Sequence, residues 1–384
     1  EIYTLSLHDA LPICLNKENR RKRENAMREQ YFAPGRIELA GNHTDHQKGR
    51  VLAAAADRGI TAQVEPNLDG MIRIVSEGYG VIEIDIFDLE PKEAEKGSAA
   101  ALVRGVAGAM DDAGARIGGF DASLVSALRP GGGLSSSAAF SVLIGKILNG
   151  LYNGGSISAA EIAGAGRVAE NRYFGKPSGF MDRLVCALGK PVYIDFMTGK
   201  TAPVTCDFGA MGLVLCLLDT GGSHENLTSA YAQITEDMEF IAGHFGCGCL
   251  AEVDPSMFFE APHLPGRERE EFRAAHFFDE NARVPKMRDA LLRRDAVEYL
   301  RLMNESGRSS ETQLQNIRTA GGSDALEKGL ALSARLLSGA GAWRVHGGGF
   351  AGCVQALMPE ARFAEYKAQT EALFGKDACM AILI

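Results

Sequence analysis

The chain has 384 residues and a formal net charge of −9 at pH 7, with 46% hydrophobic and 23% charged residues. This length suits two domains, and the composition is that of a globular protein whose core needs neither metal nor disulfides. The acidic balance disfavours a nucleic acid or an anionic membrane as partner, because such partners need a basic face, whereas a small phosphate ligand needs only a local group of N–H donors.

The N-terminal residues and the cysteines bear on processing and compartment. Residues 1–13 lack the basic segment and the continuous apolar segment of a signal peptide, so we expect a non-native or disordered tail outside the fold. The eight cysteines are scattered, mostly in apolar runs, which favours free thiols in a reducing cytoplasm over a disulfide framework. No apolar run reaches the roughly 18 residues that a membrane helix needs. We expect a cytoplasmic monomer.

The first half, which we expect to form an N-terminal domain over residues 14–209, begins with short strands. Runs of β-type residues at 51–64, 71–76 and 81–87 are separated by turn residues. An Ala- and Gly-rich stretch predicts a helix at about 98–115, and a strand at 120–127 leads into a glycine loop. Helices are predicted at about 135–152 and 158–174, and a strand at 192–196.

The second half, which we expect to form a C-terminal domain over residues 210–384, begins with a buried-type strand at 213–218. Helices are predicted at about 225–243, 285–303 and 323–338, a hairpin around 345–358, a helix at about 360–374 and a strand at 379–384. Strands and helices alternate in both halves, so the predicted fold class is mixed α/β. No Pro- or Ser-rich linker marks the boundary.

The strongest local signal is the loop Gly131-Gly-Gly-Leu-Ser-Ser-Ser-Ala138. Glycines allow positive φ and a close approach of the backbone to a ligand. The serines open a helix whose first N–H groups lack intrahelical acceptors and whose dipole favours an anion. The pattern predicts a phosphate cradle, although a serine N-cap after a flexible turn remains the simpler interpretation. The loop matches neither the P-loop pattern nor the spaced dinucleotide pattern.

Three passages, in the same order, resemble the motifs of the GHMP small-molecule kinases. The glycine–serine loop resembles the ATP loop, residues 34–49 (PGRIELAGNHTDHQKG) resemble the motif specific to galactokinases, and residues 344–352 (RVHGGGFAG) resemble the third, glycine-rich motif. The resemblance implies an N-terminal α/β domain with the ATP loop, a ferredoxin-like C-terminal domain and a site in the cleft. It also implies transfer of the γ-phosphoryl group of ATP to the anomeric hydroxyl of a hexose, with galactose as the first candidate.

The resemblance implies which residues carry the reaction. Asp182 matches the aspartate that accepts the anomeric proton or favours its loss, and Arg36 matches the arginine that pairs with it and faces the transferred phosphate. Glu170, twelve residues before Asp182, matches the Mg²⁺ carboxylate, with Ser136 or Ser137 as the hydroxyl ligand. Without the resemblance, these residues would be interpreted as a helix N-terminal acid, a surface arginine and part of a solvated helix face.

The resemblance also implies the ligand contacts. ATP contacts are expected along the loop, at Gly131, Gly132, Gly133, Leu134, Ser135, Ser136, Ser137 and Ala138. Sugar contacts are expected at Asn42, His43, Asp45, Gly179 and Tyr231. Asp45 would accept from two ring hydroxyls and Gly179 would offer a close backbone contact. Isolated histidines and tyrosines are more often core or surface residues, and His46, His346 and Trp343 receive no role.

The chain departs from the galactokinase pattern near these residues. Galactokinases usually carry Glu where this chain has Asn42, and Asn where it has Glu38. In that family position 42 reaches the 6-hydroxyl of the sugar, and an amide both donates and accepts where a carboxylate only accepts. Specificity at carbon 6 therefore stays open. Arg183 also follows Asp182 where Gln is common.

Two other functions stay open. A kinase of the same fold could act on a uronic acid, an amino sugar or a pentose, a hypothesis that Asn42 motivates. The other is a non-catalytic sensor of sugar and ATP; such relatives have a damaged serine loop, whereas residues 135–138 are intact here. In each case the expected partners are a sugar and ATP, with no nucleic acid and no membrane.

Overall fold

The structure is a computed structural model that describes residues 29–76, 80–129, 131–176, 178–221, 227–318 and 323–384. The predicted tail at 1–13 and the first two residues of the helix predicted at 225–243 lie outside these ranges.

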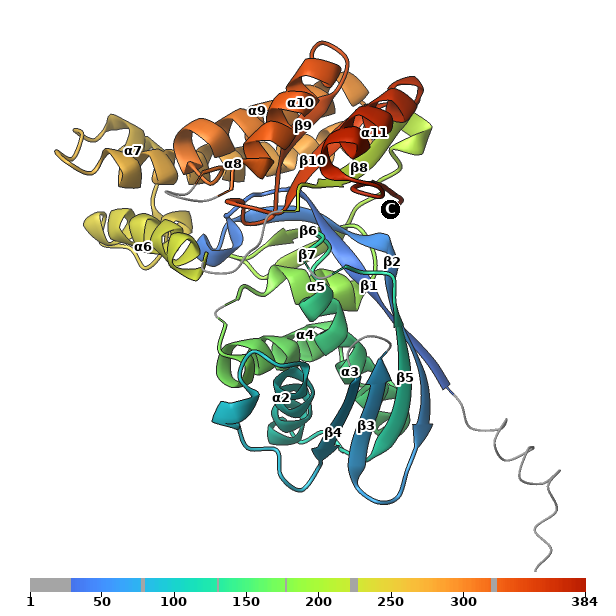
Figure 1. Cartoon of the computed structure of the whole chain (residues 1–384). Helices are drawn as coiled ribbons and strands as arrows, with labels where there is room; N and C mark the ends of the chain where they lie inside the picture. Colours follow the sequence, from blue (N-terminus) through green and yellow to red (C-terminus); the bar gives the residue numbers. More distant parts are fainter. Residues whose placement is uncertain (1–28, 77–79, 130, 177, 222–226, 319–322) are drawn as a thin grey trace, which may run out of the picture.

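The first half of the described chain forms a seven-stranded sheet in the order β4-β3-β5-β2-β6-β7, with β1 paired to β2. β3 and β5 are parallel, and the other neighbours are antiparallel. β1 and β2 are long and extend from the helical layer to the second half (Figure 1). The strands are β1 (Glu29–Ala40), β2 (Arg50–Pro66), β3 (Met71–Ser76), β4 (Gly80–Asp85), β5 (Phe120–Ser126), β6 (Val192–Asp195) and β7 (Lys200–Pro203).

Helices α2 to α5 of the described chain pack beside this sheet (Figure 1). They are α2 (Ala99–Asp112), α3 (Ser136–Asn153), α4 (Ala159–Val168), which continues as a π-helical turn (Ala169–Phe174), and α5 (Met181–Leu188). α4 begins with a reciprocal capping box between Ser158 and Glu161. α3 ends at Gly154 in the left-handed conformation that glycine adopts without strain.

The second half contains a four-stranded antiparallel sheet in the order β11-β8-β10-β9. With helices between the first and second strands and between the third and fourth, this order is the ferredoxin-like arrangement that was expected. The strands are β8 (Leu213–Asp219), β9 (Ala342–His346), β10 (Cys353–Pro359) and β11 (Cys379–Ile382). The helices are α6 (Thr228–His244), α7 (Pro255–Glu260), α8 (Glu268–Leu292), α9 (Ala296–Ser309) with a π-helical turn (Ser310–Leu314), α10 (Ala325–Leu337) and α11 (Glu360–Phe374).

The predicted helix at about 285–303 is wrong. α8 begins much earlier, at Glu268, and runs through Pro285 to Leu292. The chain then breaks at Arg294, whose φ is 54°. The Asp295 side chain accepts a hydrogen bond from the Glu298 N–H and so caps a separate helix, α9. The other predicted helices and strands are present with boundaries shifted by a few residues.

The sheets and the hydrophobic core can be compared with the predicted domain boundary between residues 209 and 210. The first sheet ends at Pro203 and the second begins at Leu213, which agrees with a boundary near this point. One hydrophobic cluster nevertheless joins residues of both halves, such as Leu52 with Leu302 and Leu357. The division into two domains therefore stays a prediction.

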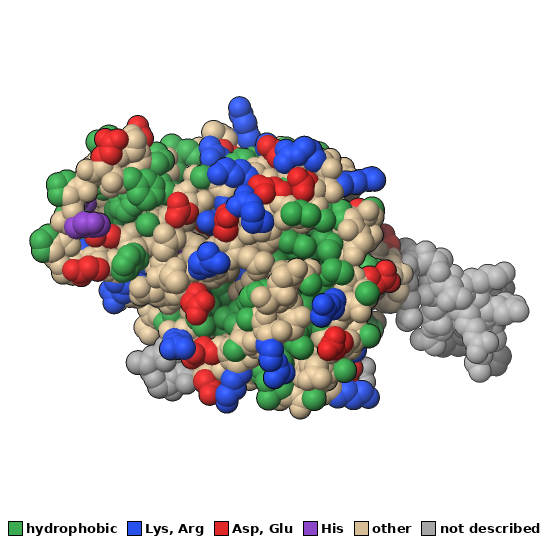
Figure 2. All heavy atoms as spheres, turned by 90° about the horizontal axis from the view of Figure 1, so that it is seen from above, with side chains coloured by type: hydrophobic (Ala, Val, Ile, Leu, Met, Phe, Trp, Pro, Cys, Tyr) green, Lys and Arg blue, Asp and Glu red, His purple; other side chains and the backbone are tan. Residues whose placement is uncertain are grey.

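Two observations concern the exterior of the described residues. No helix among them combines the length and the apolar character needed to cross a bilayer. On the face shown in Figure 2, acidic and basic side chains are interspersed over the surface. Interspersed charges of both signs create no continuous positive field for a polyanion on that face.

Candidate active site

Arg36 and Asp182 meet where β1 passes the start of α5. Arg36 Nε donates to Asp182 Oδ1 at 2.6 Å and Arg36 Nη2 to Asp182 Oδ2 at 2.9 Å, so the pair is bidentate. Ser135, which precedes α3, donates its hydroxyl to Asp182 Oδ2 at 2.6 Å. The register between β1 and β2 shifts between Pro34 and Arg36, an irregularity of the kind that redirects a side chain toward a site. The two predicted catalytic residues are thus in direct contact.

Two hydrogen bonds from Arg36 hold the glycine–serine loop in place. The Leu134 carbonyl accepts from the Arg36 N–H at 3.1 Å, and the Gly133 carbonyl accepts from Arg36 Nη1 at 2.9 Å. Gly133 has a φ of 81°, and a Cβ there would lie 2.9 Å from the Cys353 sulfur. Gly131 also has positive φ, whereas Gly132 does not appear among the residues with positive φ. The loop therefore needs glycine most strictly at Gly133.

The serine N-cap interpretation of this loop is wrong. Ser135 holds the cap position of α3 in the left-handed conformation, with φ 53°, and makes no side-chain cap hydrogen bond. Its hydroxyl goes to Asp182 instead. Ser136 and Ser137 are partly exposed at the start of α3, where the free N–H groups of the first turn favour an anion.

The two site aspartates differ in how readily they ionise. Burial would raise the pKa of Asp182, but the Arg36 charge, its hydrogen bonds and the Ser135 hydroxyl together hold that pKa below its ordinary value. Asp45 has no such pair. Burial, with the negative charges of Asp182 and Glu38 nearby, raises the pKa of Asp45 to about 6.

Asp45 and Gly179, which are both predicted sugar contacts, lie against each other. Asp45 begins a short 3-10 turn (Asp45–Gln47) after β1, and Gly179 precedes α5. A Cβ on Gly179 would overlap the Asp45 carboxylate, so a larger residue at this position would displace that carboxylate. Arg183 Nη1 donates to the Gly179 carbonyl at 3.1 Å and fixes that backbone.

The other three predicted sugar contacts hydrogen bond to the third glycine motif. Asn42 Nδ2 donates to the Gly347 carbonyl at 2.7 Å, and His43 Nε2 donates to the Gly348 carbonyl at 3.0 Å. The Tyr231 hydroxyl donates to the Gly349 carbonyl at 2.9 Å. Three consecutive carbonyls of the loop between β9 and β10 thus accept from three residues of the predicted sugar site.

The amide of Asn42 lies among four polar partners of the protein. Besides Gly347, Nδ2 approaches Glu38 Oε1 at 3.4 Å, and Oδ1 accepts from Asn316 Nδ2 at 3.2 Å and from Ser310 Oγ at 3.4 Å. An amide has two N–H groups and two lone pairs, so these partners use all four. The side chain is 1% exposed. The direct contact of Asn42 with the sugar stays a prediction.

Glu170, the predicted metal ligand, lies in the π-helical turn after α4 and is buried. Its carboxylate forms an ion pair with Arg183, which is also buried. Burial lowers the pKa of the Arg183 guanidinium to about 10, so this group remains charged at neutral pH. Arg183, which stands where the galactokinase pattern has Gln, therefore provides the charge that neutralises Glu170.

Sequence reasoning missed two residues of this centre, His346 and Glu38. His346 Nε2 donates to the Gly133 carbonyl at 2.9 Å, and burial lowers its pKa to about 3, so the ring is neutral. Glu38 lies two residues after Arg36 and pairs with Arg344 from the third motif. The only signal in the sequence was their position inside the first and third motifs.

The motifs match known family models. Residues 22–66 match the galactokinase galactose-binding signature, and residues 101–190 match the N-terminal domain of GHMP kinases. Among curated proteins, the galactokinase of Actinobacillus pleuropneumoniae serotype 3 is 31% identical over 333 residues, which cover 86% of this chain and 85% of the relative. The galactokinase of Glaesserella parasuis is 31% identical over 340 residues, covering 87% and 86%.

Solved structures show the same fold. Galactokinase from Lactococcus lactis, solved in complex with galactose, superposes with a TM-score of 0.82 at 23% identity and covers 96% of this chain and 98% of that one. A mevalonate kinase from Methanococcus jannaschii gives a TM-score of 0.66 at 15% identity, covering 94% and 99%. Motif order, fold and the extent of identity agree, and the chain belongs to the galactokinase family of the GHMP kinases.

Proposed function

We propose that this protein transfers the γ-phosphoryl group of ATP to the anomeric hydroxyl of galactose. The single observation that carries the proposal is the Arg36–Asp182–Ser135 centre, which joins the phosphate loop to the side of the site where Asp45 meets Gly179. Membership of the galactokinase family supports galactose as the acceptor. An intact serine loop at residues 135–138 favours an enzyme over a sugar sensor.

The transfer makes one bond and breaks one. The anomeric oxygen bonds to the γ-phosphorus, the bond from that phosphorus to the bridging oxygen breaks, and ADP leaves with the electron pair. Asp182 takes the anomeric proton or favours its loss. Its low pKa, fixed by Arg36 and Ser135, suits a carboxylate that orients the hydroxyl and acts electrostatically more than a strong base. Arg36, held against Asp182, would face the transferred phosphate.

ATP would bind along residues 131–138. Residues Gly131 and Gly133 supply the left-handed turns of this loop, and the first N–H groups of α3 would hold phosphate oxygens. Arg36 Nη1 and His346 Nε2 both donate to the Gly133 carbonyl, so the loop backbone is held before any nucleotide arrives. Preorganised donors avoid the cost of ordering the loop on binding.

The sugar would bind against Asp45 and Gly179. An ionised Asp45 would accept from two ring hydroxyls, and the backbone of Gly179 would limit the space beside it. We keep His43 and Tyr231 as residues at the edge of this pocket, where they hold the carbonyls of Gly348 and Gly349.

The donor set suits Mg²⁺, which takes oxygen ligands and leaves several positions to phosphates and water. Glu170 would hold it together with the hydroxyl of Ser136 or Ser137. When bound, the ion neutralises charge on the β- and γ-phosphates. Arg183 occupies the Glu170 carboxylate in this structure, so the arginine must share or yield that position.

The proposal also includes a cytoplasmic location and a monomeric state. All seven cysteines in the described part of the chain are free, which suits a reducing cytoplasm. We expect a monomer whose partners are the sugar and ATP, and light scattering of the purified protein would measure its mass.

An ATP-consumption assay over a panel of sugars tests the function. The panel holds galactose, glucose, 6-deoxygalactose, galacturonate, galactosamine and arabinose, each with wild type and with Asp182→Asn. We expect galactose to give the highest kcat/KM and the variant to be inactive with every sugar. Efficient turnover of galacturonate or a pentose with none of galactose would replace the acceptor while keeping the kinase.

A further inference from the structure

Residues 41–49 connect β1 to β2 and carry two of the predicted sugar contacts, His43 and Asp45. Hydrogen bonds within this β1–β2 connection close its turn. Thr44 Oγ1, for example, donates to the Gly41 carbonyl at 2.9 Å. Such local bonds shape the connection, but they do not determine where Asp45 lies relative to the rest of the site.

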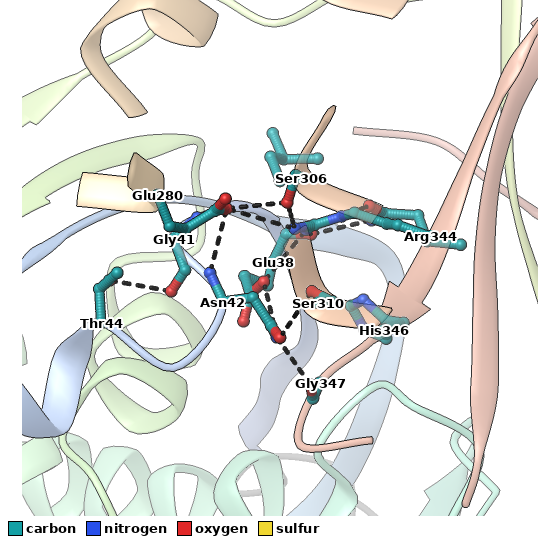
Figure 3. A network of polar contacts seen from close by, with 12 residues as sticks. Glu38, Gly41, Asn42, Thr44, Glu280, Ser306, Ser310, Arg344, His346 and Gly347 are labelled. Carbon is teal, nitrogen blue, oxygen red and sulfur yellow. Dashed lines mark hydrogen bonds and ion pairs between the residues drawn. The ribbon is translucent and has the colours of Figure 1, made fainter. Parts of the chain in front are cut away.

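Helix α8 of the second half holds the start of the connection. Glu280 Oε1 accepts from the Gly41 N–H at 3.0 Å and lies 3.4 Å from the Asn42 nitrogen (Figure 3). His276 lies one helical turn before Glu280, and its Nε2 is 3.0 Å from the Asn42 carbonyl oxygen. A carbonyl only accepts, so Nε2 carries the proton and donates it. Helix α8 therefore binds the backbone on both sides of Asn42.

The same helix holds the end of the connection. Asn281 Oδ1 accepts from the Arg50 N–H at 2.8 Å, at the first residue of β2. Phe277 packs so closely that a Cβ on Gly49 would lie 2.9 Å from its ring. Because residues four apart lie on one face of a helix, Phe277 and Asn281 share a face with the two residues that hold the start. One face of α8 thus fixes both ends of the β1–β2 connection.

The His276 ring uses both of its nitrogens in this arrangement. The ring is fully buried, and burial lowers its pKa despite the nearby Glu280 charge, so it is neutral. A neutral imidazole has one donor and one acceptor. The donor goes to Asn42, and Nδ1 accepts from the Ser309 hydroxyl at 2.7 Å. Removal of the donor would take a hydrogen bond from a buried carbonyl.

We infer that His276 is a positioning residue of the sugar site, acting through the Asn42 backbone on the place of Asp45. The inference rests on the proposed function, in which Asp45 accepts from two hydroxyls of galactose. The Asp45 carboxylate lies against Gly179, so a shift of the connection would move it away from these hydroxyls. Hydroxyls that do not react are held alike in the ground state and the transition state, so the shift raises KM and leaves kcat unchanged.

Steady-state kinetics with galactose test this role. His276→Phe keeps a ring of similar size without the donor, whereas the amide of His276→Gln can donate to the same carbonyl. Ser309→Ala is the matched control, because it removes the partner of the other ring nitrogen. We expect His276→Phe to raise the galactose KM about tenfold, with kcat and the ATP KM within about threefold of wild type.

The other two variants separate positioning from stability. His276→Gln should return the galactose KM to within about threefold of wild type. Ser309→Ala should lower the Tm and leave the galactose KM unchanged. An unchanged galactose KM in His276→Phe, or an equal rise in Ser309→Ala, would overturn the inference.

Hydrogen exchange of the ligand-free protein gives a readout that needs no substrate. Mass spectrometry of peptides from residues 41–49 should show faster exchange in His276→Phe than in wild type, with no change at residues 131–138. Asn281→Ala removes the bond at the other end of the connection and is a milder change, because this side chain is only partly buried.

We expect Asn281→Ala to exchange faster at residues 41–49 and to raise the galactose KM, which decides the inference even if His276→Phe does not fold. Exchange at wild-type rates in the variants that fold would overturn it. A wild type inactive on galactose would refute the proposed function, and the exchange rates would still decide whether His276 and α8 hold the connection.

Discussion

Asp45 and Asp182 belong to one site, but they ionise in different pH ranges. Arg36 keeps Asp182 charged, whereas burial and neighbouring carboxylates leave the pKa of Asp45 at about 6. Protonation turns one carboxylate oxygen into a hydrogen-bond donor, so only the ionised form offers two acceptor-only oxygens to two hydroxyls. We therefore expect kcat/KM for the sugar to fall about tenfold per pH unit below pH 6, while ATP binding changes little. A pH profile that stays flat down to pH 5 would remove Asp45 from the sugar contacts.

The raised pKa of Asp45 also affects the stability of the fold. An acid whose pKa is raised on folding destabilises the folded state once it ionises. The free energy of unfolding therefore falls as pH rises from about 4 to about 6. Asp45→Asn should stabilise the free protein by about 1–2 kcal/mol at pH 7 and by less at pH 5. Urea unfolding at both values measures this, with the exposed Asp111→Asn as control. Equal stabilisation at the two pH values would contradict the shifted pKa.

Arg183 determines how available Glu170 is to a metal ion. Arg183→Gln removes the partner and leaves a buried unpaired carboxylate, which costs about 3–5 kcal/mol in the absence of a cation. We expect the variant to have a lower Tm without metal, a larger rise in Tm on adding Mg²⁺ and ATP, and half-maximal activity at lower Mg²⁺ than wild type. Glu170→Gln should lose the Mg²⁺ response. If Mg²⁺ shifts the Tm of Arg183→Gln and wild type equally, Glu170 is not a metal ligand.

At the scale of elements, the glycine–serine loop allows two neighbouring glycines, Gly132 and Gly133, to be compared. Gly133 has positive φ and a Cβ there would press on Cys353, whereas a Cβ on Gly132 would lie 3.2 Å from Arg129. Gly133→Ala should weaken ATP binding by about tenfold or more, and Gly132→Ala by much less. Calorimetric titration with ATP measures both, and galactose binding reports on the fold. Equal losses at the two positions would mean that the close contact with β10 is unimportant.

The sequence predicted the regular elements well where hydrophobic periodicity was uninterrupted. β1 was not predicted as a strand, because Pro34 and Gly35 stand in its middle, where they usually exclude a central strand. The break between α8 and α9 was missed, because Pro285 resembles a helix start and because the cap at Asp295 lies within a charged stretch. Both errors come from local signals that tertiary packing overrides.

The sequence predicted which residues belong to the candidate site through its motifs, but not the contacts that these residues make. The contact of Arg36 with Asp182 agrees with the expected pairing. The bonds from Asn42, His43 and Tyr231 to residues 347–349 could not be predicted, because they join segments far apart in sequence and depend on how the two halves pack. The pair of Glu170 with Arg183 likewise needed coordinates.

At the scale of the whole molecule, α8 of the second half supports the loop that follows β1 in the first half. Glu280 is fully buried, accepts from the Gly41 N–H and pairs with Arg283. Burial opposes its ionisation, but Arg283, His276 and Arg344 hold the pKa of Glu280 at about 2. A depressed pKa contributes stability above the unfolded value, and this stability is lost as pH falls toward 2.

Glu280→Gln should therefore lower the free energy of unfolding by about 3–5 kcal/mol at pH 7 and by less near pH 4. Denaturant unfolding at the two pH values measures the difference. The matched control is Glu298→Gln on α9, whose ion pair with Arg301 is largely exposed. A loss at Glu280 no larger than that of the control would show that the two halves are held together elsewhere.

The measurement that tests the account most directly is identification of the product. Wild type and Asp182→Asn are incubated with ATP, Mg²⁺ and galactose, and the products are followed by phosphorus and proton NMR. The account predicts that wild type forms galactose 1-phosphate, with the phosphorus coupled to the anomeric proton, together with one equivalent of ADP. It predicts that Asp182→Asn binds both ligands and forms neither product. Phosphate attached to any other carbon, or ADP released without a sugar phosphate, would contradict it.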